Sequence, residues 1–360
     1  MKKVIFISAL IISFLCHSQE VLVQKTTQID KAREVANTFL TNEYIPGMSI
    51  SVSKNDELIW SEGFGFSDID NKTKVVPSKT QFRLASISKP ITAVGLAILA
   101  DKKQLKFDES LYTYIPNYPK KAYDFSIRQI GGHLAGIRHY KGQEFISNKK
   151  MSIKEGLDIF KNDPLIHQPG TKYQYSTYGW NLLSAVIEEI TQKDFTQFMA
   201  EVLFAPLKMQ NTTLDLSDQE MPNRTKFYRK TNQNKITLSP SVSNEHKVAG
   251  GGFIATSEDL IHFGNEIIDP QIISAESLKE LLKAQKTQDG KSTNYGIGFG
   301  IGIGTSPRNT PNFSHSGGGA GATTLLLIYP EEKVVIAIVT NLSQVPIRDF
   351  GKKLENVFLN

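Results

Sequence analysis

A serine and a lysine three residues apart stand directly before an apolar segment. Ser86 and Lys89 are followed by Pro90 and by the run 91–100, which is apolar on nearly every side. A serine hydroxyl becomes an effective nucleophile only when a base takes its proton. A lysine can be that base if burial lowers its pKa from about 10.4 towards neutrality. The pair therefore predicts nucleophilic catalysis by a lysine-activated serine.

The short spacing alone also fits a helix-capping serine beside a surface lysine. A surface lysine is, however, poorly placed against an apolar run. Pro90 belongs in the first turn of a helix, where its missing N–H is no loss, so Ser86 and Lys89 share one face of a helix N-terminus. That end of a helix also offers free N–H groups to a developing oxyanion.

Two further polar clusters follow along the chain. Tyr175-Ser176-Thr177 precedes a predicted helix, and His315-Ser316-Gly317-Gly318 precedes a predicted strand. With these motifs in this order, the chain resembles the serine β-lactamase and penicillin-binding protein superfamily, specifically its class C-like branch. The resemblance covers roughly residues 40–345, and the segment 132–140 is similar to the mitochondrial serine β-lactamase-like proteins of animals.

The resemblance implies a role for each motif residue. Ser86 would carry the acyl group, while Lys89 and Tyr175 would share the proton transfers. The backbone N–H groups of Ser86 and Gly318 would form the oxyanion hole. Which of Lys89 and Tyr175 is the resting base stays open at this stage.

The same resemblance places Thr177, His315, Ser316 and Gly317 against the substrate. His315 replaces the lysine of many relatives, and because a histidine is only partly cationic at neutral pH, we expect a weaker demand for a substrate carboxylate. Thr177 stands where most relatives have asparagine. An asparagine side chain can both donate to and accept from a substrate amide, whereas the shorter threonine hydroxyl cannot span the same two contacts. This difference puts efficient β-lactam turnover in doubt. In this family His133 supports a helix end rather than catalysis.

Strand patterns at both ends of the chain flank a mostly helical middle. Short turns favour antiparallel pairing, so we expect an α/β fold of the α+β type, β-lactamase/transpeptidase-like, with one antiparallel sheet flanked by helices and an inserted helical lobe. A single catalytic domain would span 19–360, with a sheet lobe at about 26–85 and 250–360 and a helical lobe at about 86–249. The patterns predict helices at 26–42, 91–100, 155–161, 178–192, 194–204 and 347–358, strands at 48–53, 58–60, 295–304, 323–329 and 334–340, and an irregular stretch at 210–245.

Other segments of the chain do not match the motifs of nucleotide, metal or α/β-hydrolase sites. The alternating glycines of 296–302 lack the spacing of a dinucleotide-binding motif. They predict a strand whose glycine face, which has no side chains, packs against other backbone. The glycines 250–252 lack the lysine of a phosphate loop, and neither H-E-x-x-H nor G-x-S-x-G occurs. We therefore expect no cofactor and no metal.

Composition limits the partners. The chain has 360 residues, 40% of them hydrophobic, and a formal net charge of +5 without a basic stripe. A nucleic-acid-binding protein would usually show such a stripe with interleaved aromatic residues. We expect a small-molecule or peptide substrate and no nucleic acid, and the sequence does not indicate an oligomeric state.

The N-terminus has the pattern of a secretory signal peptide. Lys2 and Lys3 precede an apolar run at 4–15, and cleavage after Ser18 would give a periplasmic or secreted protein with no integral membrane segment. A run of this length covers about 18 Å, short of the ~30 Å core of a bilayer. A lipid anchor on Cys16 is the alternative. Cys16 is the single cysteine, so the processed chain would have no thiol chemistry.

These observations predict an exported serine hydrolase that acts through an acyl-enzyme on Ser86. Its substrates would be peptide-type amides, such as D-amino-acid or small peptides, or small esters. The alternatives are a true β-lactamase and, from another class, a non-catalytic binding or scaffold protein that retains the pocket.

Overall fold

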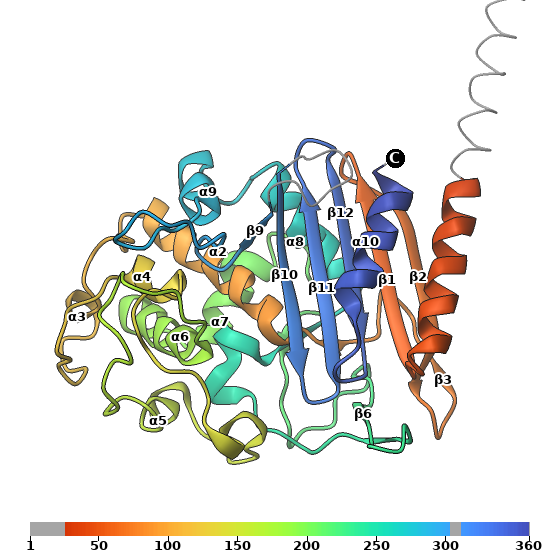
Figure 1. Cartoon of the computed structure of the whole chain (residues 1–360), viewed down its shortest axis with the longest axis horizontal. Helices are drawn as coiled ribbons and strands as arrows, with labels where there is room; N and C mark the ends of the chain where they lie inside the picture. The colour runs from red at the N-terminus through yellow and green to blue at the C-terminus, as the bar shows by residue number, and fades with distance from the viewer. Residues whose placement is uncertain (1–25, 303–310, 360) are drawn as a thin grey trace, which may run out of the picture.

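A seven-stranded antiparallel sheet forms the centre of the molecule in the computed structural model, which describes residues 26–302 and 311–359 (Figure 1). The strands lie in the order β3 (Thr73–Lys74), β2 (Glu57–Asp68), β1 (Gly47–Lys54), β12 (Val334–Thr340), β11 (Ala322–Tyr329), β10 (Asn312–Gly319) and β9 (Gly300–Gly302). β1 (Gly47–Lys54) pairs with β12 (Val334–Thr340), so the first strand of the chain lies beside the last. The predicted signal peptide at 1–18 and Cys16 lie outside the described residues.

The central strands are buried on both faces, which explains their continuous apolar runs. On one face, Ile50, Ile336 and Ile338 pack in a cluster with the helix at 26–42 and with α10 (Ile347–Phe358). The opposite face packs against α8 (Ser257–Ile268), where Val335 and Phe263 belong to the larger core cluster. The sheet is therefore the middle layer of a three-layer structure.

The helical lobe is inserted between β4 (Phe82–Arg83) and β8 (Phe253–Ala255). Its centre is α2 (Ser88–Asp101), which is buried from Ser88 to Leu99. The remaining elements of this part of the chain are short, apart from α6: α3 (Leu111–Tyr114), α4 (Ile127–Gly131), α5 (Ile153–Leu157), α6 (Thr177–Thr191), α7 (Phe195–Met199), β5 (Thr213–Leu214), β6 (Tyr228–Lys230) and β7 (Ile236–Leu238). None of the helices in the described ranges is long and apolar enough to cross a bilayer.

The structure confirms the predicted fold class. The helices at 26–42, 178–192 and 347–358 and the hairpin of β1 with β2 (Glu57–Asp68) lie where the patterns place them. α5 ends at Leu157, earlier than predicted. The polar stretch 210–245 is irregular apart from β5, β6 and β7.

The prediction of a strand over 295–304 is largely wrong. Within 295–302, the described part of this run, only β9 (Gly300–Gly302) pairs with the sheet, since Gly298 has a positive φ of 83° that interrupts an extended chain. Residues 303 and 304 of the predicted strand lie outside the described residues. The inference of close backbone contact does hold: a Cβ on Gly296 would lie 2.1 Å from the carbonyl oxygen of Leu281. The apolar patterns do not predict β10 (Asn312–Gly319), because its glycines and polar residues lack an apolar alternation.

Gly296→Ala should destabilise the protein by at least about 2 kcal/mol, because the contact is with backbone that cannot move aside cheaply. Gly290→Ala is the control, because no atom lies within 4 Å of its Cβ position. Its positive φ of 84° alone opposes that substitution, and we expect a destabilisation of about 1 kcal/mol. Thermal unfolding of both variants tests this. Equal shifts in Tm would contradict the close-contact interpretation.

Candidate active site

Ser86 lies in a 3₁₀ turn, Ala85–Ile87, between β4 and α2. Both backbone groups of Leu84, the residue before the turn, form hydrogen bonds that hold it in place. The Leu84 N–H donates to Phe253 O at 2.8 Å, and the Leu84 carbonyl accepts from Thr324 Oγ1 at 2.9 Å. Ala85 takes a left-handed φ of 47°, a conformation that non-glycine residues rarely adopt. The result is a sharp corner that leaves Ser86 only partly buried at the helix N-terminus.

The Lys89 amine is fully buried and meets three oxygens. Its Nζ lies 3.1 Å from Ser86 Oγ, 3.3 Å from Thr177 Oγ1 and 2.6 Å from Gly250 O. Burial lowers the pKa of Lys89 well below its ordinary value, because the charged form is poorly solvated there. A neutral amine can accept the Ser86 proton and still donate to the other two oxygens.

Tyr175 lies just before α6, with Lys89 Nζ 4.9 Å from the centre of its ring. Burial raises the pKa of Tyr175, and a hydrogen bond with the Ser86 side chain opposes this only in part. The phenol is therefore neutral at rest and carries a proton that it can donate. Its hydroxyl and the Lys89 amine both reach Ser86.

A buried histidine, His133, and a partly buried one, His139, hold the backbone that follows Tyr175. The N–H of Ser176 donates to His133 Nδ1 and the N–H of Thr177 donates to His139 Nδ1, both at 3.1 Å. Burial lowers the pKa of His133 well below its ordinary value and that of His139 to about 4, so both rings are neutral acceptors. His133 thus supports the start of α6 through the backbone, in line with its sequence interpretation.

His315 lies in β10 and is held between two partners. Its Nδ1 lies 2.8 Å from Ser316 O and its Nε2 lies 2.9 Å from the Tyr295 hydroxyl. Because a carbonyl oxygen only accepts, Nδ1 carries the hydrogen and Nε2 accepts from Tyr295. Burial is the largest cause that lowers the pKa of His315 to about 3, and Lys89 adds to it when its amine is protonated. The expectation of a partly cationic His315 is therefore wrong.

β10 brings its glycines against the Ser86 turn. A Cβ on Gly317 would lie 2.2 Å from Leu84 O, so only glycine permits this approach. Gly318, by contrast, has no atom within 4 Å of its Cβ position and lines the same cavity as Ser86. The structure thus places Gly318 in the same cavity as Ser86, where the resemblance assigns their backbone N–H groups to an oxyanion hole.

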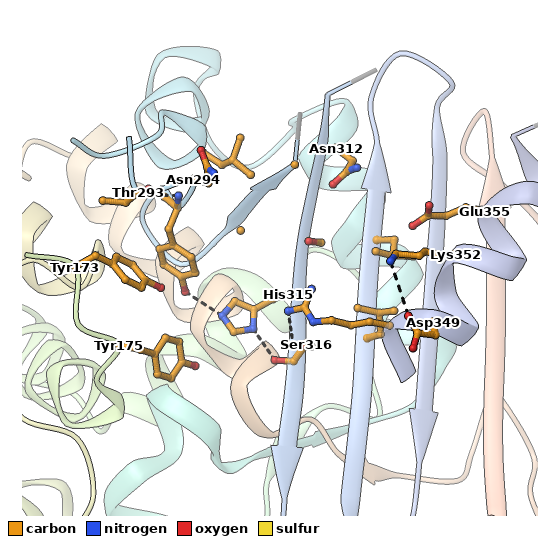
Figure 2. Close-up of a pocket in the computed structure, with 18 residues that line it drawn as sticks. Tyr173, Tyr175, Thr293, Asn294, Asn312, His315, Ser316, Asp349, Lys352 and Glu355 are labelled. Carbon is orange, nitrogen blue, oxygen red and sulfur yellow. Dashed lines mark hydrogen bonds and ion pairs between the residues drawn. The ribbon is translucent and has the colours of Figure 1, made fainter. Parts of the chain in front are cut away.

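Two cavities flank these groups. The tyrosine cavity, of about 630 Å³, is lined by Tyr173, Tyr175, Tyr295, His315, Ser316 and Arg348 among others, and Figure 2 shows Tyr173 and Tyr175 across it from His315. The serine cavity is smaller, and its lining includes Ser86, Tyr140, Phe145, Thr177, Lys247 and Gly318. Within the described residues, no group of three or more His, Cys, Asp or Glu side chains could hold a metal ion.

Sequence reasoning missed the cations of both cavities. Arg348, on α10, donates to Ser316 Oγ at 2.8 Å, and Lys247 follows the irregular stretch before Val248–Gly252. In the sequence, Arg348 is one of several charges on the polar face of an amphipathic helix. Nothing local distinguishes it from a solvated arginine.

Comparison with known proteins agrees with this arrangement. The family model described as Beta-lactamase matches residues 32–357. The human mitochondrial serine beta-lactamase-like protein LACTB is 25% identical, covering 91% of this chain and 79% of its own. Protein flp of Staphylococcus aureus strain MW2 is 24% identical, covering 84% of this chain and 61% of its own.

Solved structures share the fold at low sequence identity. A D-amino acid amidase from Ochrobactrum anthropi SV3, complexed with L-phenylalanine amide, has a TM-score of 0.80 at 20% identity, covering 93% of this chain and 99% of its own. EstCE1, described as a hydrolase with promiscuous acyltransferase activity, has a TM-score of 0.81 at 16% identity, covering 94% of this chain and 100% of its own. The octameric penicillin-binding protein homologue from Pyrococcus abyssi has a TM-score of 0.79 at 18% identity, covering 92% of this chain and 77% of its own.

The buried His315 should make the protein sensitive to acid. In the unfolded chain a histidine takes up a proton near pH 6.5, whereas folded His315 does so only at about 3. The stability that it contributes is therefore complete above pH 6.5 and is lost progressively as the pH falls towards 3. His315→Gln should flatten the fall in the free energy of unfolding between pH 7 and pH 4, measured by urea denaturation. Parallel profiles for the two proteins would rule this out.

Proposed function

The chain belongs to the beta-lactamase family, whose model spans residues 32–357, and from this premise we propose that it is a serine hydrolase that forms an acyl-enzyme on Ser86. The observation that carries the proposal is the contact of the buried Lys89 amine with Ser86 Oγ at 3.1 Å. A neutral amine in that position is the base that a serine nucleophile requires.

In the acylation half-reaction, Lys89 takes the proton of Ser86 as Oγ attacks the substrate carbonyl. The N–H groups of Ser86 and Gly318 stabilise the oxyanion. Tyr175 then donates its proton to the leaving group. The Lys89 ammonium, 4.9 Å from the Tyr175 ring, stabilises the resulting phenolate, because an opposite charge nearby favours the ionised form.

Deacylation restores both groups. A water attacks the acyl ester and gives its proton to the Tyr175 phenolate, while the Lys89 ammonium returns its proton to Ser86 Oγ as the ester bond breaks. The sum of the two steps is hydrolysis, with no proton left over. The scheme gives Lys89 the role of base towards serine and Tyr175 that of acid towards the leaving group.

The substrates that fit this site are peptide-type amides or small esters. The D-amino acid amidase and EstCE1 described above share the fold, which supports an acyl-transfer site that accepts such compounds. Since Tyr175 lines the tyrosine cavity, we assign the leaving group to that cavity, where Arg348 supplies a cation. The pattern at 1–18, outside the described residues, supports export of the protein.

Intact-protein mass spectrometry tests the nucleophile. We expect one fluorophosphonate adduct on the wild type, none on Ser86→Ala and an unchanged adduct on the surface control Ser78→Ala. A penicillin adduct that persists would favour a peptidase-like site, whereas rapid turnover would favour a true β-lactamase. An adduct that survives in Ser86→Ala would refute the assignment, and no adduct on the wild type would favour a binding protein.

Replacement of the two proton carriers should be severe and non-additive. Lys89→Met and Tyr175→Phe should each lower kcat/KM for an ester substrate by about 10³-fold or more, and the double variant should lose little beyond either single one. Steady-state kinetics with active-site titration measure this. A near wild-type rate in Lys89→Met would remove the lysine from the mechanism.

Arg348 should select leaving groups that carry a carboxylate. The matched probes are 3-carboxyphenyl butyrate and its neutral analogue 3-carbamoylphenyl butyrate. We expect a wild-type preference for the first and a loss of about 10-fold in that preference in Arg348→Gln, the scale of one charged hydrogen bond. An unchanged ratio of kcat/KM would exclude this role for Arg348.

A further inference from the structure

Lys247 is a buried cation in the wall of the serine cavity. Only 4% of the residue is exposed, yet it lines the same cavity as Ser86 and Gly318. Its ammonium donates to Phe145 O at 3.0 Å, and among the described residues no carboxylate oxygen lies within 4.0 Å of it. Burying a charge without an ionic partner is unfavourable, so this position calls for an anion from outside the chain.

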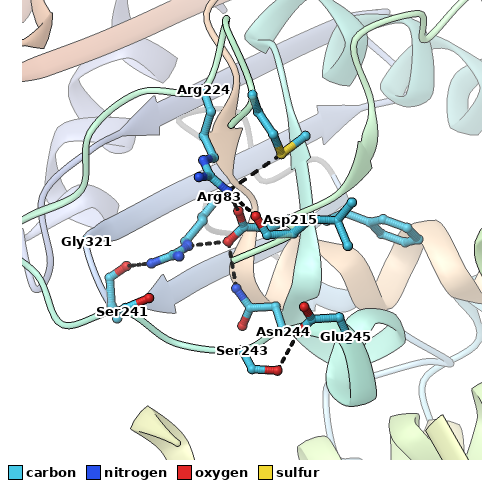
Figure 3. A network of polar contacts seen from close by, with 12 residues as sticks. Arg83, Asp215, Arg224, Ser241, Ser243, Asn244, Glu245 and Gly321 are labelled. Atoms are coloured by element: carbon cyan, nitrogen blue, oxygen red, sulfur yellow. Dashed lines mark hydrogen bonds and ion pairs between the residues drawn. The ribbon is translucent and has the colours of Figure 1, made fainter. Parts of the chain in front are cut away.

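The acidic groups nearest to Lys247 form no ion pair with it. Figure 3 shows contacts converging on Asp215, which accepts from Arg83 Nε at 2.6 Å, Asn244 Nδ2 at 2.8 Å and Arg224 Nη1 at 3.0 Å. Glu245 accepts from the Ser243 hydroxyl through one carboxylate oxygen, and its other oxygen, Oε1, is buried without a hydrogen-bond partner. Neither carboxylate forms an ion pair with Lys247, and the Arg83 guanidinium adds a like charge to its surroundings.

The same network fixes Lys247 relative to the reacting groups. Asn244, bonded to Asp215, begins the turn Glu245–Lys247, and the next turn carries Gly250, the acceptor for Lys89. Arg83 also donates to Ala320 O at 2.7 Å, just beyond the end of β10. Lys247, the Lys89 acceptor and the strand of Gly318 are therefore held by one set of buried contacts.

Lys247 remains mostly protonated at neutral pH. Burial, together with the Arg83 charge, lowers its pKa to about 8, and Glu245 and Asp215 oppose this. Its surroundings within the cavity are partly aromatic, since the rings of Tyr140 and Phe145 lie 5.8 and 5.9 Å from Nζ. A site of this kind suits a short aliphatic chain that ends in a carboxylate.

The position of Lys247 assigns that carboxylate to one half of the substrate. The acyl group remains bonded to Ser86 after the first half-reaction, so it occupies the cavity that Ser86 lines. The leaving group departs towards Tyr175, which lines the tyrosine cavity. An anion at Lys247 therefore belongs to the acyl group.

We propose that Lys247 binds a carboxylate at the end of the substrate's acyl group, so that the preferred substrates are amides or esters of dicarboxylic acyl groups. This inference rests on the proposed acyl-enzyme on Ser86. It assigns the serine cavity to an acidic acyl chain, while Arg348 acts on the leaving group in the other cavity.

The test compares 4-nitrophenyl hemiglutarate with 4-nitrophenyl pentanoate, each corrected for spontaneous hydrolysis. The wild type should prefer the hemiglutarate, and Lys247→Met should reduce the ratio of the two kcat/KM values by about 10- to 100-fold, the range for loss of a buried charged hydrogen bond. Lys247→Arg should keep most of the preference. The exposed Lys149→Met and the opposite-cavity variant Arg348→Gln should both retain the wild-type ratio.

The possible failures are distinguishable. Hydrolysis that survives in Ser86→Ala overturns the proposed function. Hydrolysis through Ser86 with equal rates for the two esters, or an equal loss of both in Lys247→Met, overturns the role of Lys247 alone, because a merely structural lysine would affect both esters alike.

Inhibition of the wild-type enzyme tests the same proposal if the Lys247→Met variant fails to fold. On the wild type, free glutarate should inhibit pentanoate ester hydrolysis competitively, and pentanamide should not. Equal inhibition by the two compounds would also overturn the role of Lys247. Thermal unfolding of Lys247→Met should show an unchanged or higher Tm, since replacing a buried unpaired charge by an apolar side chain of similar size removes its desolvation cost.

Discussion

The buried amine of Lys89 is the constraint on which the rest of the structure depends. A lysine at zero exposure is tolerable only if its N–H groups find acceptors and its charge can be lost. The three oxygens that this amine meets come from separate places in the chain: the turn before α2, the first residue of α6 and the turn at Val248–Gly252. Three separate segments of the helical lobe must therefore meet around this one nitrogen.

The elements that hold these acceptors are fixed mainly through backbone groups. Leu84 bonds to the sheet through Thr324, and Thr177 is placed by the ring of His139. The glycine of β10 that packs against Leu84 O allows the strand to reach the serine. Reacting side chains thus sit at the ends of rigid elements, where small shifts are resisted by many contacts.

The fold and the centre of the site were accessible from sequence because their signals are local. The spacing of Ser86, Lys89 and Pro90 places two groups on one helical turn, and the apolar runs define the central strands. β10 was missed because a strand of glycine, serine and histidine carries no apolar alternation. The charge of His315 was misjudged because its burial, the largest cause of its lowered pKa, arises only through the fold.

Arg348 and Lys247 could not have been found from sequence for a related reason. Each is an ordinary charged residue until the sheet and the irregular stretch bring it to a cavity wall, and no spacing rule relates either residue to Ser86. Buried and interfacial charges are in general placed by tertiary contacts, which leave no periodic trace in the chain.

The electrostatic arrangement explains why a lysine can act as the base here. The rings of His133, His139 and His315 surround the centre as neutral groups, and burial is the largest cause of each lowered pKa. The same burial favours neutral Lys89 at rest, so that proton transfer from Ser86 creates a new ion pair in a region of low dielectric. There the oxyanion donors act on developing charge with little competition from water. Arg348 and Lys247 lie outside this centre, in the walls of the two cavities, where they can orient a substrate without holding Lys89 in a fixed protonation state.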